Sequence, residues 1–260
     1  MNLKRIATAV LVLLALAACG RGPRQMRPRV DPEFLNQTKE QLFQKAEDLY
    51  GARKWARART YYSHIYENYP NDPLGRRSLL RVADTFYNQG DQVNLVEAQY
   101  KYRDFINRFP GSENADYAML QIAMVSYKQM EKPDRDQQKT REAQEKFSDM
   151  IKAFPNSPLR PEAEKRQRDV LDRLAKHEHI IARFYMKRRS YPAAVQRLNF
   201  LIDTYPNYGE RDAAFYDLGI ALAALGRNGE ARLYFERVLS EFPNSSYSEK
   251  AKRRLDSIKA

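Results

Sequence analysis

The side chains that could do chemistry are few, and their spacing does not suit it. Of the three histidines, His177 and His179 lie two residues apart, so on a helix they point to different faces and cannot hold one metal ion. His64 stands alone. The sequence contains neither a glycine-rich phosphate loop nor a Gly-x-Ser-x-Gly nucleophile motif. We therefore predict no catalytic residue, no metal site and no enzymatic activity.

Asp134, Arg135 and Asp136 form a cluster whose two carboxylates could act as an acid and base pair. The surrounding stretch, Glu-Lys-Pro-Asp-Arg-Asp, is too polar to be core. We interpret the cluster as a helix N-terminus with an ion pair that shapes a long turn.

The only cysteine, Cys19, ends an N-terminal apolar run. Lys4 and Arg5 precede thirteen uncharged, mostly apolar residues, fewer than the roughly twenty that a helical membrane span needs. Residues 1–18 are therefore predicted to be a secretory signal peptide. The small residues just before Cys19 resemble the bacterial lipobox. An ordinary signal peptide with an incidental cysteine is the alternative.

The lipobox resemblance implies cleavage before Cys19, a diacylglyceryl group on its thiol and an acyl chain such as palmitate on its amine. Two or more such chains give stable membrane anchoring. Gly20, as the second residue of the mature chain, implies an outer-membrane address on the periplasmic face. Apart from this covalent lipid, we expect no cofactor.

Residues 19–35 are predicted to be a flexible tether, rich in arginine and interrupted by glycine and proline. Its arginines either meet anionic headgroups or belong to a solvated spacer. Losing Lys4 and Arg5 with the signal lowers the formal net charge of the chain from +12 to +10. Acidic residues interleave the basic clusters, and no nucleic-acid-reading module is recognisable, so we expect no nucleic-acid partner.

An aromatic residue followed by proline recurs five times in the rest of the chain. An alanine lies twelve residues before each proline, and large apolar residues follow that alanine at four and seven positions. This spacing forms one buried stripe on a helix that the proline then ends. The alanines are Ala58, Ala98, Ala143, Ala194 and Ala231, and the prolines are Pro70, Pro110, Pro155, Pro206 and Pro243.

This pattern resembles the tetratricopeptide repeat, a helical hairpin of about 34 residues. The sequence therefore predicts an all-α tetratricopeptide-repeat α-solenoid of about five helix pairs. Small residues place the first helix of each pair at Ala46, Ala83, Ala123, Ala182 and Gly219.

One longer helix is expected from Pro161 to about Arg188, between the third and fourth pairs. The stretch has no internal proline or glycine, and about 28 residues would span roughly 42 Å. We accordingly expect N-terminal repeats 1–3 over residues 36–158. Repeats 4 and 5, with a terminal helix, are expected over residues 159–260.

Residues 172–197 indicate a particular family of tetratricopeptide-repeat proteins. Together with Asp134-Arg135-Asp136, Phe154-Pro155-Asn156-Ser157 and the lipobox, they resemble the BamD family of lipoproteins in the outer-membrane β-barrel assembly machinery, the BAM complex. The resemblance covers nearly the whole mature chain and departs at the arginine-rich tether. It implies a non-enzymatic scaffold that docks on the periplasmic domains of BamA, works with other assembly lipoproteins and helps insert outer-membrane proteins.

The same resemblance implies that the N-terminal repeats meet the C-termini of unfolded outer-membrane proteins. Tyr50, Tyr87 and Tyr127 each lie four residues after the small residue of a first helix, so they would line an aromatic peptide groove. Arg77 is a candidate for the terminal carboxylate of the peptide. The tyrosines would equally serve as packing residues.

For docking on BamA, Arg188 and Arg197 are the candidate residues, because both follow the family-like stretch. Their alternative role is that of ordinary exposed arginines. Another function also stays open, that of a periplasmic tetratricopeptide adaptor of the Tol–Pal or cell-wall synthesis machinery. Such adaptors share aromatic-Pro-Asn-Ser turns but typically begin with a coiled coil and lack a lipobox. A wall-binding enzyme with a repeat arm is less suited, because the repeats leave no room for a catalytic domain.

Overall fold

A computed structural model describes residue 34 and residues 36–258. The signal peptide, Cys19 and nearly all of the predicted tether lie outside the described residues. Within them every regular element of any length is an α-helix. The helices are α2 (Lys39–Gly51), α3 (Trp55–Asn68), α4 (Pro73–Gln89), α5 (Gln92–Arg108), α6 (Ala115–Lys128), α7 (Gln138–Ala153), α8 (Arg160–Lys187), α9 (Tyr191–Thr204), α10 (Arg211–Ala224), α11 (Asn228–Glu241) and α12 (Ser248–Ser257).

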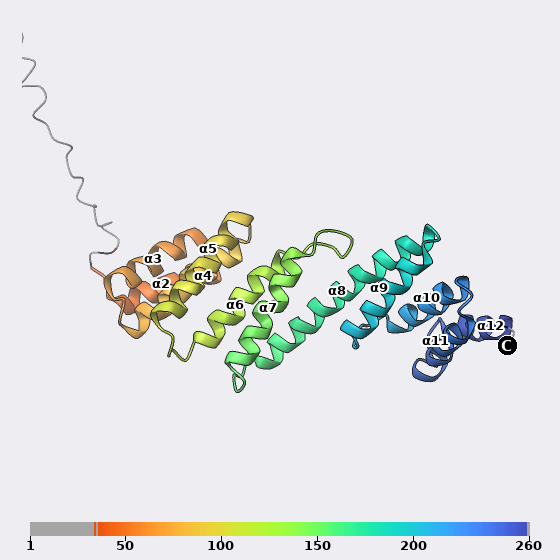
Figure 1. Cartoon of the computed structure of the whole chain (residues 1–260). Coiled ribbons are helices and arrows are strands. Elements are labelled where there is room, and N and C mark those ends of the chain that lie inside the picture. Colours follow the sequence, from red (N-terminus) through yellow and green to blue (C-terminus); the bar gives the residue numbers. More distant parts are fainter. Residues whose placement is uncertain (1–33, 35, 259–260) are drawn as a thin grey trace, which may run out of the picture.

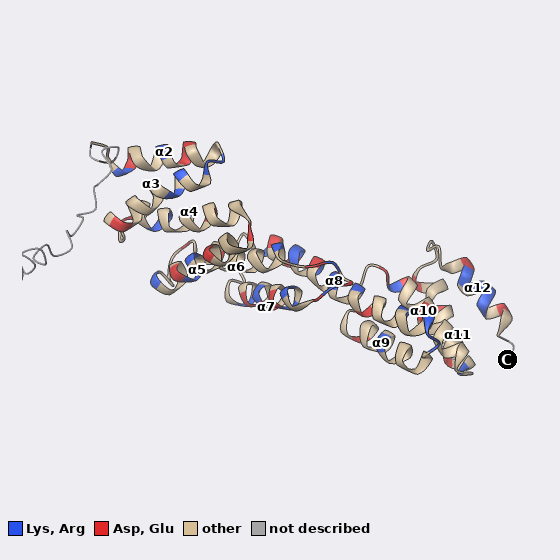
Figure 2. Ribbon diagram, turned by 90° about the horizontal axis from the view of Figure 1, so that it is seen from above, with Lys and Arg blue, Asp and Glu red and all other residues tan. Residues whose placement is uncertain are grey.

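Consecutive helices from α2 to α12 pack against one another and form an elongated stack, with α2 and α12 at opposite ends (Figure 1). The hairpins α2/α3, α4/α5, α6/α7, α8/α9 and α10/α11 follow each other, and α12 covers the last of them. Basic and acidic residues are interspersed along the stack (Figure 2). The architecture is the expected all-α tetratricopeptide-type solenoid.

The aromatic-proline pairs end the second helix of each hairpin. Each aromatic residue has left the helical region, with φ near −130° and ψ near +60°, because a following proline disfavours helical backbone at the preceding residue. Its N–H bonds back to the carbonyl four residues earlier, which closes the last turn. The five residues are Tyr69, Phe109, Phe154, Tyr205 and Phe242.

The expected small residues lie where the two helices of a hairpin approach most closely. Ala46 on α2 and Ala58 on α3 are both fully buried, and the corresponding alanines of the other hairpins are buried in the same way. In the last hairpin even alanine would be too large, because a Cβ on Gly219 would lie 2.6 Å from the Phe235 ring. Close approach of the helices therefore explains the small-residue pattern.

Left-handed backbone conformations close four of the hairpin turns. Gly90 and Gly226 adopt φ values of 78° and 74°. Arginine takes the same conformation in two other turns, with φ 57° at Arg53 and 59° at Arg189. Left-handed φ is costly for a residue with a Cβ, so these two turns carry local strain.

The long helix is confirmed: α8 has 28 residues, from Arg160 to Lys187. It is also the first helix of the fourth hairpin, because it packs on α7 along one part and on α9 along the other. Ala163, Val170 and Leu174 belong to a core shared with α6 and α7. Ala175 and Ala182 belong to the C-terminal core shared with α9 to α12.

The α6–α7 turn is long but held in place. Buried Gln137 donates to the carbonyls of Lys132 and Arg135, at 2.9 and 3.0 Å, and Asp136 accepts from the N–H of Gln138 at 2.8 Å. Asp136 thus supports a helix N-terminus, as expected. No ion pair within the Asp134–Asp136 cluster occurs in this turn of the described chain, so that part of the interpretation is wrong.

Candidate peptide-binding groove

Tyr50, Tyr87 and Tyr127 lie near the ends of α2, α4 and α6, one in each of the first three hairpins. All three rings are half-buried, and a cation from the following hairpin lies over each ring. Arg81 lies 4.8 Å from the Tyr50 ring centre, Lys128 lies 4.7 Å from that of Tyr87, and Arg166 lies 5.3 Å from that of Tyr127. The three tyrosines are therefore members of a repeated tyrosine–cation arrangement.

The tyrosines also make packing contacts. Tyr50 meets Trp55 edge-on at 4.9 Å between ring centres, and Tyr127 meets Phe147 at 6.1 Å. The Tyr50 hydroxyl accepts a hydrogen bond from Asn88 at 2.7 Å. Burial raises the pKa of both Tyr50 and Tyr87, so their hydroxyls stay protonated at neutral pH. The three rings are therefore packed within the hairpins but remain partly exposed.

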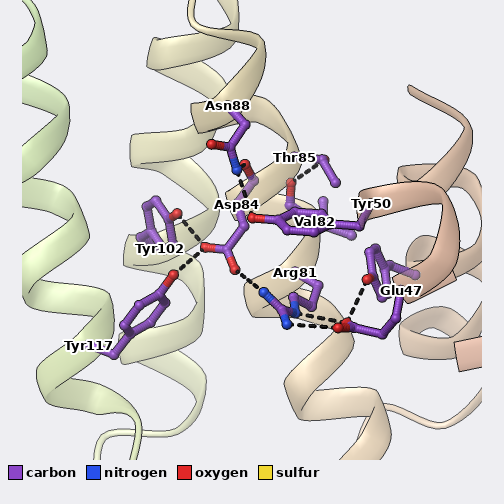
Figure 3. Close-up of polar contacts among 10 residues, drawn as sticks. Glu47, Tyr50, Arg81, Val82, Asp84, Thr85, Asn88, Tyr102 and Tyr117 are labelled. Carbon is purple, nitrogen blue, oxygen red and sulfur yellow. Dashed lines mark hydrogen bonds and ion pairs between the residues drawn. The ribbon is translucent and has the colours of Figure 1, made fainter. Parts of the chain in front are cut away.

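A buried ionic network lies beside Tyr50 and joins the first three hairpins (Figure 3). Asp84 on α4 is only 3% exposed, and it accepts hydrogen bonds from the Tyr102 and Tyr117 hydroxyls at 2.6 and 2.8 Å. Arg81 contacts the same carboxylate at 3.3 Å. Burial raises the pKa of Asp84, although the two hydroxyls and Arg81 act in the opposite direction.

Arg81 also donates two hydrogen bonds to the Glu47 carboxylate on α2, at 2.9 and 2.8 Å. The Tyr62 hydroxyl donates to the same carboxylate at 2.6 Å. Burial opposes the charge on Arg81, but Glu47 and Asp84 outweigh it and raise the pKa of the guanidinium. Its position, fixed by both carboxylates, holds the Arg81 cation over the Tyr50 ring.

Arg77 is not part of this tyrosine row. It lies in the first turns of α4, ten residues before Tyr87, which is about 15 Å along the helix axis. Its guanidinium stacks on the Phe43 ring at 4.8 Å and lines a separate surface cavity. The structure thus brings the three tyrosines into one repeated arrangement and places Arg77 elsewhere.

The two docking candidates have different surroundings. Arg197 on α9 pairs with Glu178 on α8 at 3.0 Å, so its charge is already matched within the chain. Arg188 is exposed at the end of α8, and its guanidinium lies 4.7 Å from the centre of the half-exposed Phe184 ring. The pair Arg188 and Phe184 offers the freer surface.

A second buried network stabilises the C-terminal hairpins. His179 on α8 is 1% exposed and lies 2.9 Å from Asp217 on α10, which also accepts from Arg183 at 2.6 Å. Burial acts to raise the pKa of Asp217, but the hydrogen bonds from His179 and Arg183 outweigh it and lower the pKa. Sequence reasoning missed this network. The signal that could have found it is the 34-residue spacing of Arg183 and Asp217, one repeat length.

The described part of the chain contains neither a candidate metal-binding cluster nor a candidate membrane-spanning helix. Residue 34 and residues 36–258 contain no group of three or more His, Cys, Asp or Glu side chains that could hold a metal ion. No helix in the same residues is long and apolar enough to cross a bilayer. Cys19, the lipidation candidate, lies outside them.

This fold, a stack of helical hairpins with a repeated tyrosine–cation arrangement and buried ion pairs, defines a helical-repeat protein. A family model described as YfiO, outer membrane lipoprotein, matches residues 35–233. The chain belongs to this family of outer-membrane lipoproteins.

The curated relatives agree with the family match. Outer membrane protein assembly factor BamD of Neisseria meningitidis serogroup A is 26% identical over 256 residues, which cover 94% of each chain. The protein of the same name from Caulobacter vibrioides is 26% identical over 249 residues, which cover 96% of this chain and 80% of the relative. These relatives are named as assembly factors for outer-membrane proteins, in agreement with the prediction of a non-enzymatic protein.

Among solved structures, the TPR2AB domain of yeast Sti1 in a complex with pHSP90 aligns with a TM-score of 0.45. The two are 16% identical, and the alignment covers 80% of this chain and 78% of that one.

Proposed function

We propose that the protein is a lipid-anchored scaffold of the BAM complex that docks on BamA and presents unfolded outer-membrane proteins for insertion. Membership of the outer-membrane lipoprotein family supports the general role. The finer steps rest on particular residues: Cys19 for the anchor, the tyrosine row for clients, and the end of α8 for BamA.

The observation that carries the client step is the repeated tyrosine–cation arrangement. It runs through three successive hairpins, with Tyr50 under Arg81, Tyr87 under Lys128 and Tyr127 under Arg166. An extended peptide passes successive repeats of a solenoid, so equivalent residues can contact it at regular intervals. Aromatic rings suit the apolar side chains of a barrel strand.

For the BamA step, the exposed Arg188–Phe184 pair and Arg197 on α9 are the proposed contacts. An arginine stacked on an aromatic ring keeps its N–H donors free for a carboxylate on a partner. For membrane attachment, cleavage before Cys19 and its acylation would tether the scaffold to the periplasmic face of the outer membrane.

The client step is tested by fluorescence anisotropy with a labelled ten-residue peptide from the C-terminal strand of a barrel protein. Tyr87→Ala is expected to weaken binding about tenfold, since stacking on one aromatic ring contributes roughly 0.5–1.5 kcal/mol beyond its buried area. Tyr100→Ala is the matched control, because Tyr100 is 61% exposed on α5 outside the tyrosine row. Equal affinity of the wild type and the Tyr87 variant would refute the groove.

The BamA step is tested by co-purification from envelopes solubilised in mild detergent. Recovery of a large barrel protein with repeated periplasmic domains, reduced in Arg188→Glu/Arg197→Glu, is the expected result. Recovery of Tol–Pal or wall-synthesis proteins instead would favour the adaptor function.

A further inference from the structure

An apolar stripe lies on one exposed face of α5. Val93, Val96 and Tyr100 form it, and their side chains are 72%, 55% and 61% exposed. Their spacing of three and four residues places them in one row along the helix, whereas buried residues of α5 such as Ala98 face the core. A single exposed apolar side chain is ordinary, but a row of three indicates a surface that another molecule covers.

The stripe adjoins a groove between α5, α6 and α7. Arg103, three residues after Tyr100 and therefore on the same face of α5, lines a surface cavity of about 360 Å³. The apolar part of the cavity lining consists of Ile106 on α5 with Met119 and Ile122 on α6, all of them buried or half-buried. Stripe and groove together form the α5–α7 surface.

Three charged side chains of the groove are free to bind a partner. Arg103 lies on α5, and Glu145 and Asp149 lie four residues apart on one face of α7. All three are exposed, and within the described residues none of them makes a hydrogen bond or an ion pair. The remaining charge of the lining, Lys146, already pairs with Glu142 at 3.5 Å. The groove thus presents two carboxylates and one guanidinium beside an apolar surface.

We propose that the α5–α7 surface binds an amphipathic α-helix of a partner protein. Apolar residues of that helix, spaced three and four apart, would pack on Val96, Tyr100 and the apolar lining of the groove. Two basic residues four apart would meet Glu145 and Asp149, and an acidic residue would meet Arg103. The inference goes beyond the proposed function, because neither the client step nor the BamA step uses these residues.

Spacing and charge favour a helix over two other occupants. Side chains of an extended peptide alternate with a period of two, so they do not match the row formed by Val93, Val96 and Tyr100. The surface is therefore separate from the tyrosine row, and Tyr100 remains a suitable control for an extended client. A bilayer with anionic headgroups would be repelled by Glu145 and Asp149, and a flat bilayer would leave the groove unfilled.

The test is photo-crosslinking of the full-length chain in intact envelopes. The photo-reactive amino acid p-benzoylphenylalanine stands in place of Tyr100, which exchanges one exposed aromatic side chain for another. Mass spectrometry identifies the crosslinked segment. We expect one protein segment with apolar residues three and four apart and two basic residues four apart. The control chain carries the photo-reactive amino acid in place of Leu233, which is exposed on α11, and it should not give this product.

A charge reversal tests the ion pairs in the chain that carries the photo-reactive amino acid. Glu145→Lys/Asp149→Lys turns two attractions into repulsions, so the yield of the product is expected to fall about tenfold. Asp203→Lys/Asp256→Lys is the matched control, since it reverses two exposed acidic charges on α9 and α12, and it should keep the full yield. Circular dichroism checks that every variant is folded.

Val93→Ser/Val96→Ser tests the apolar stripe without changing any charge. It removes apolar contact area, and the yield is again expected to fall about tenfold. A product formed with lipid, with a second copy of this chain or with a barrel-protein client would overturn the proposal. A yield that neither double variant lowers, or the absence of any product at the Tyr100 position, would overturn it as well.

Discussion

Glu47 and Arg81 form a two-hydrogen-bond ion pair across the boundary between the first and second hairpins, and they lie 34 residues apart. Arg183 and Asp217 lie 34 residues apart as well, across the boundary between the fourth and fifth hairpins, with the charges reversed. Counted from the small residue of each first helix, both pairs use the same two positions. The repeat geometry therefore brings the same two positions of neighbouring hairpins within ion-pair distance. The acidic residue can occupy either of the two positions.

Breaking the first pair should destabilise the N-terminal hairpins. Arg81→Met leaves the partly buried Glu47 and the buried Asp84 without their cation, so we expect the free energy of unfolding to fall by about 2–3 kcal/mol. Urea unfolding, followed by circular dichroism, measures the change. Adding Glu47→Gln to the same chain should recover about 1 kcal/mol of that loss. Strictly additive effects would show that the two side chains are not coupled.

The Asp217 network predicts a pH effect of definite sign. The folded-state pKa of Asp217 lies below its ordinary value of 3.8, so its carboxylate contributes stability above that pH. The contribution is lost as the pH falls below about 4 and through the folded-state pKa. Urea midpoints at intervals from pH 7 to pH 2 should therefore fall more steeply in the wild type than in Asp217→Asn. Parallel curves for the two proteins would contradict the shift.

Gly75 is predicted to tolerate no side chain. A Cβ there would lie 1.7 Å from the Tyr69 carbonyl oxygen, so the α3–α4 turn would have to open. We expect Gly75→Ala to cost about 3 kcal/mol or more, at the upper end of overpacking effects. Gly51→Ala is the control, because nothing lies within 4 Å of a Cβ at that helix end, and it should stabilise α2 by about 0.5–1 kcal/mol. Similar melting temperatures of the two variants would refute the close approach.

Arg189 is predicted to lower the stability of the folded protein. Its turn has the hydrogen-bond pattern of the α10–α11 turn, where Gly226 takes the left-handed position. Arg189→Gly should therefore stabilise the protein by about 1 kcal/mol, and Gly226→Ala should destabilise it by a similar amount. Thermal unfolding by calorimetry compares the two. If the Arg189→Gly variant is more stable but co-purifies with less BamA than the wild type does, the arginine contributes to docking.

The helices and their order could be predicted because local signals determine them. Proline after Tyr69 or Phe242 stops a helix whatever lies around it, and Ala58 or Ala231 marks the face that a neighbouring helix covers. The backbone conformations of the turns were harder to predict from the sequence. Gly226 is a recognisable turn residue, but nothing local indicates that Arg53 or Arg189 would take a left-handed conformation, since packing of the flanking helices imposes it.

The site was predicted only in part, because its chemistry depends on contacts between hairpins. The offset of Tyr50 and Tyr87 from the small residue is a local count, whereas the cation over each ring comes from the next repeat. Arg77 has the right chemistry for a carboxylate, but its stacking partner Phe43 lies on another hairpin and directs it into a separate cavity. The lipidation of Cys19 stays a prediction.

The length of α8 changes how the solenoid can come apart. In most repeat proteins each unit contacts only its neighbours, so the end units can fray independently. Here one unbroken helix contributes Val170 to the middle core and Ala182 to the C-terminal core. Melting of the last hairpins therefore removes support from half of a helix that the middle hairpins also need. The molecule should therefore unfold in fewer and larger steps than its number of repeats implies. A rotation that a partner imposes on one half of the stack is also transmitted to the other half through the continuous helix α8.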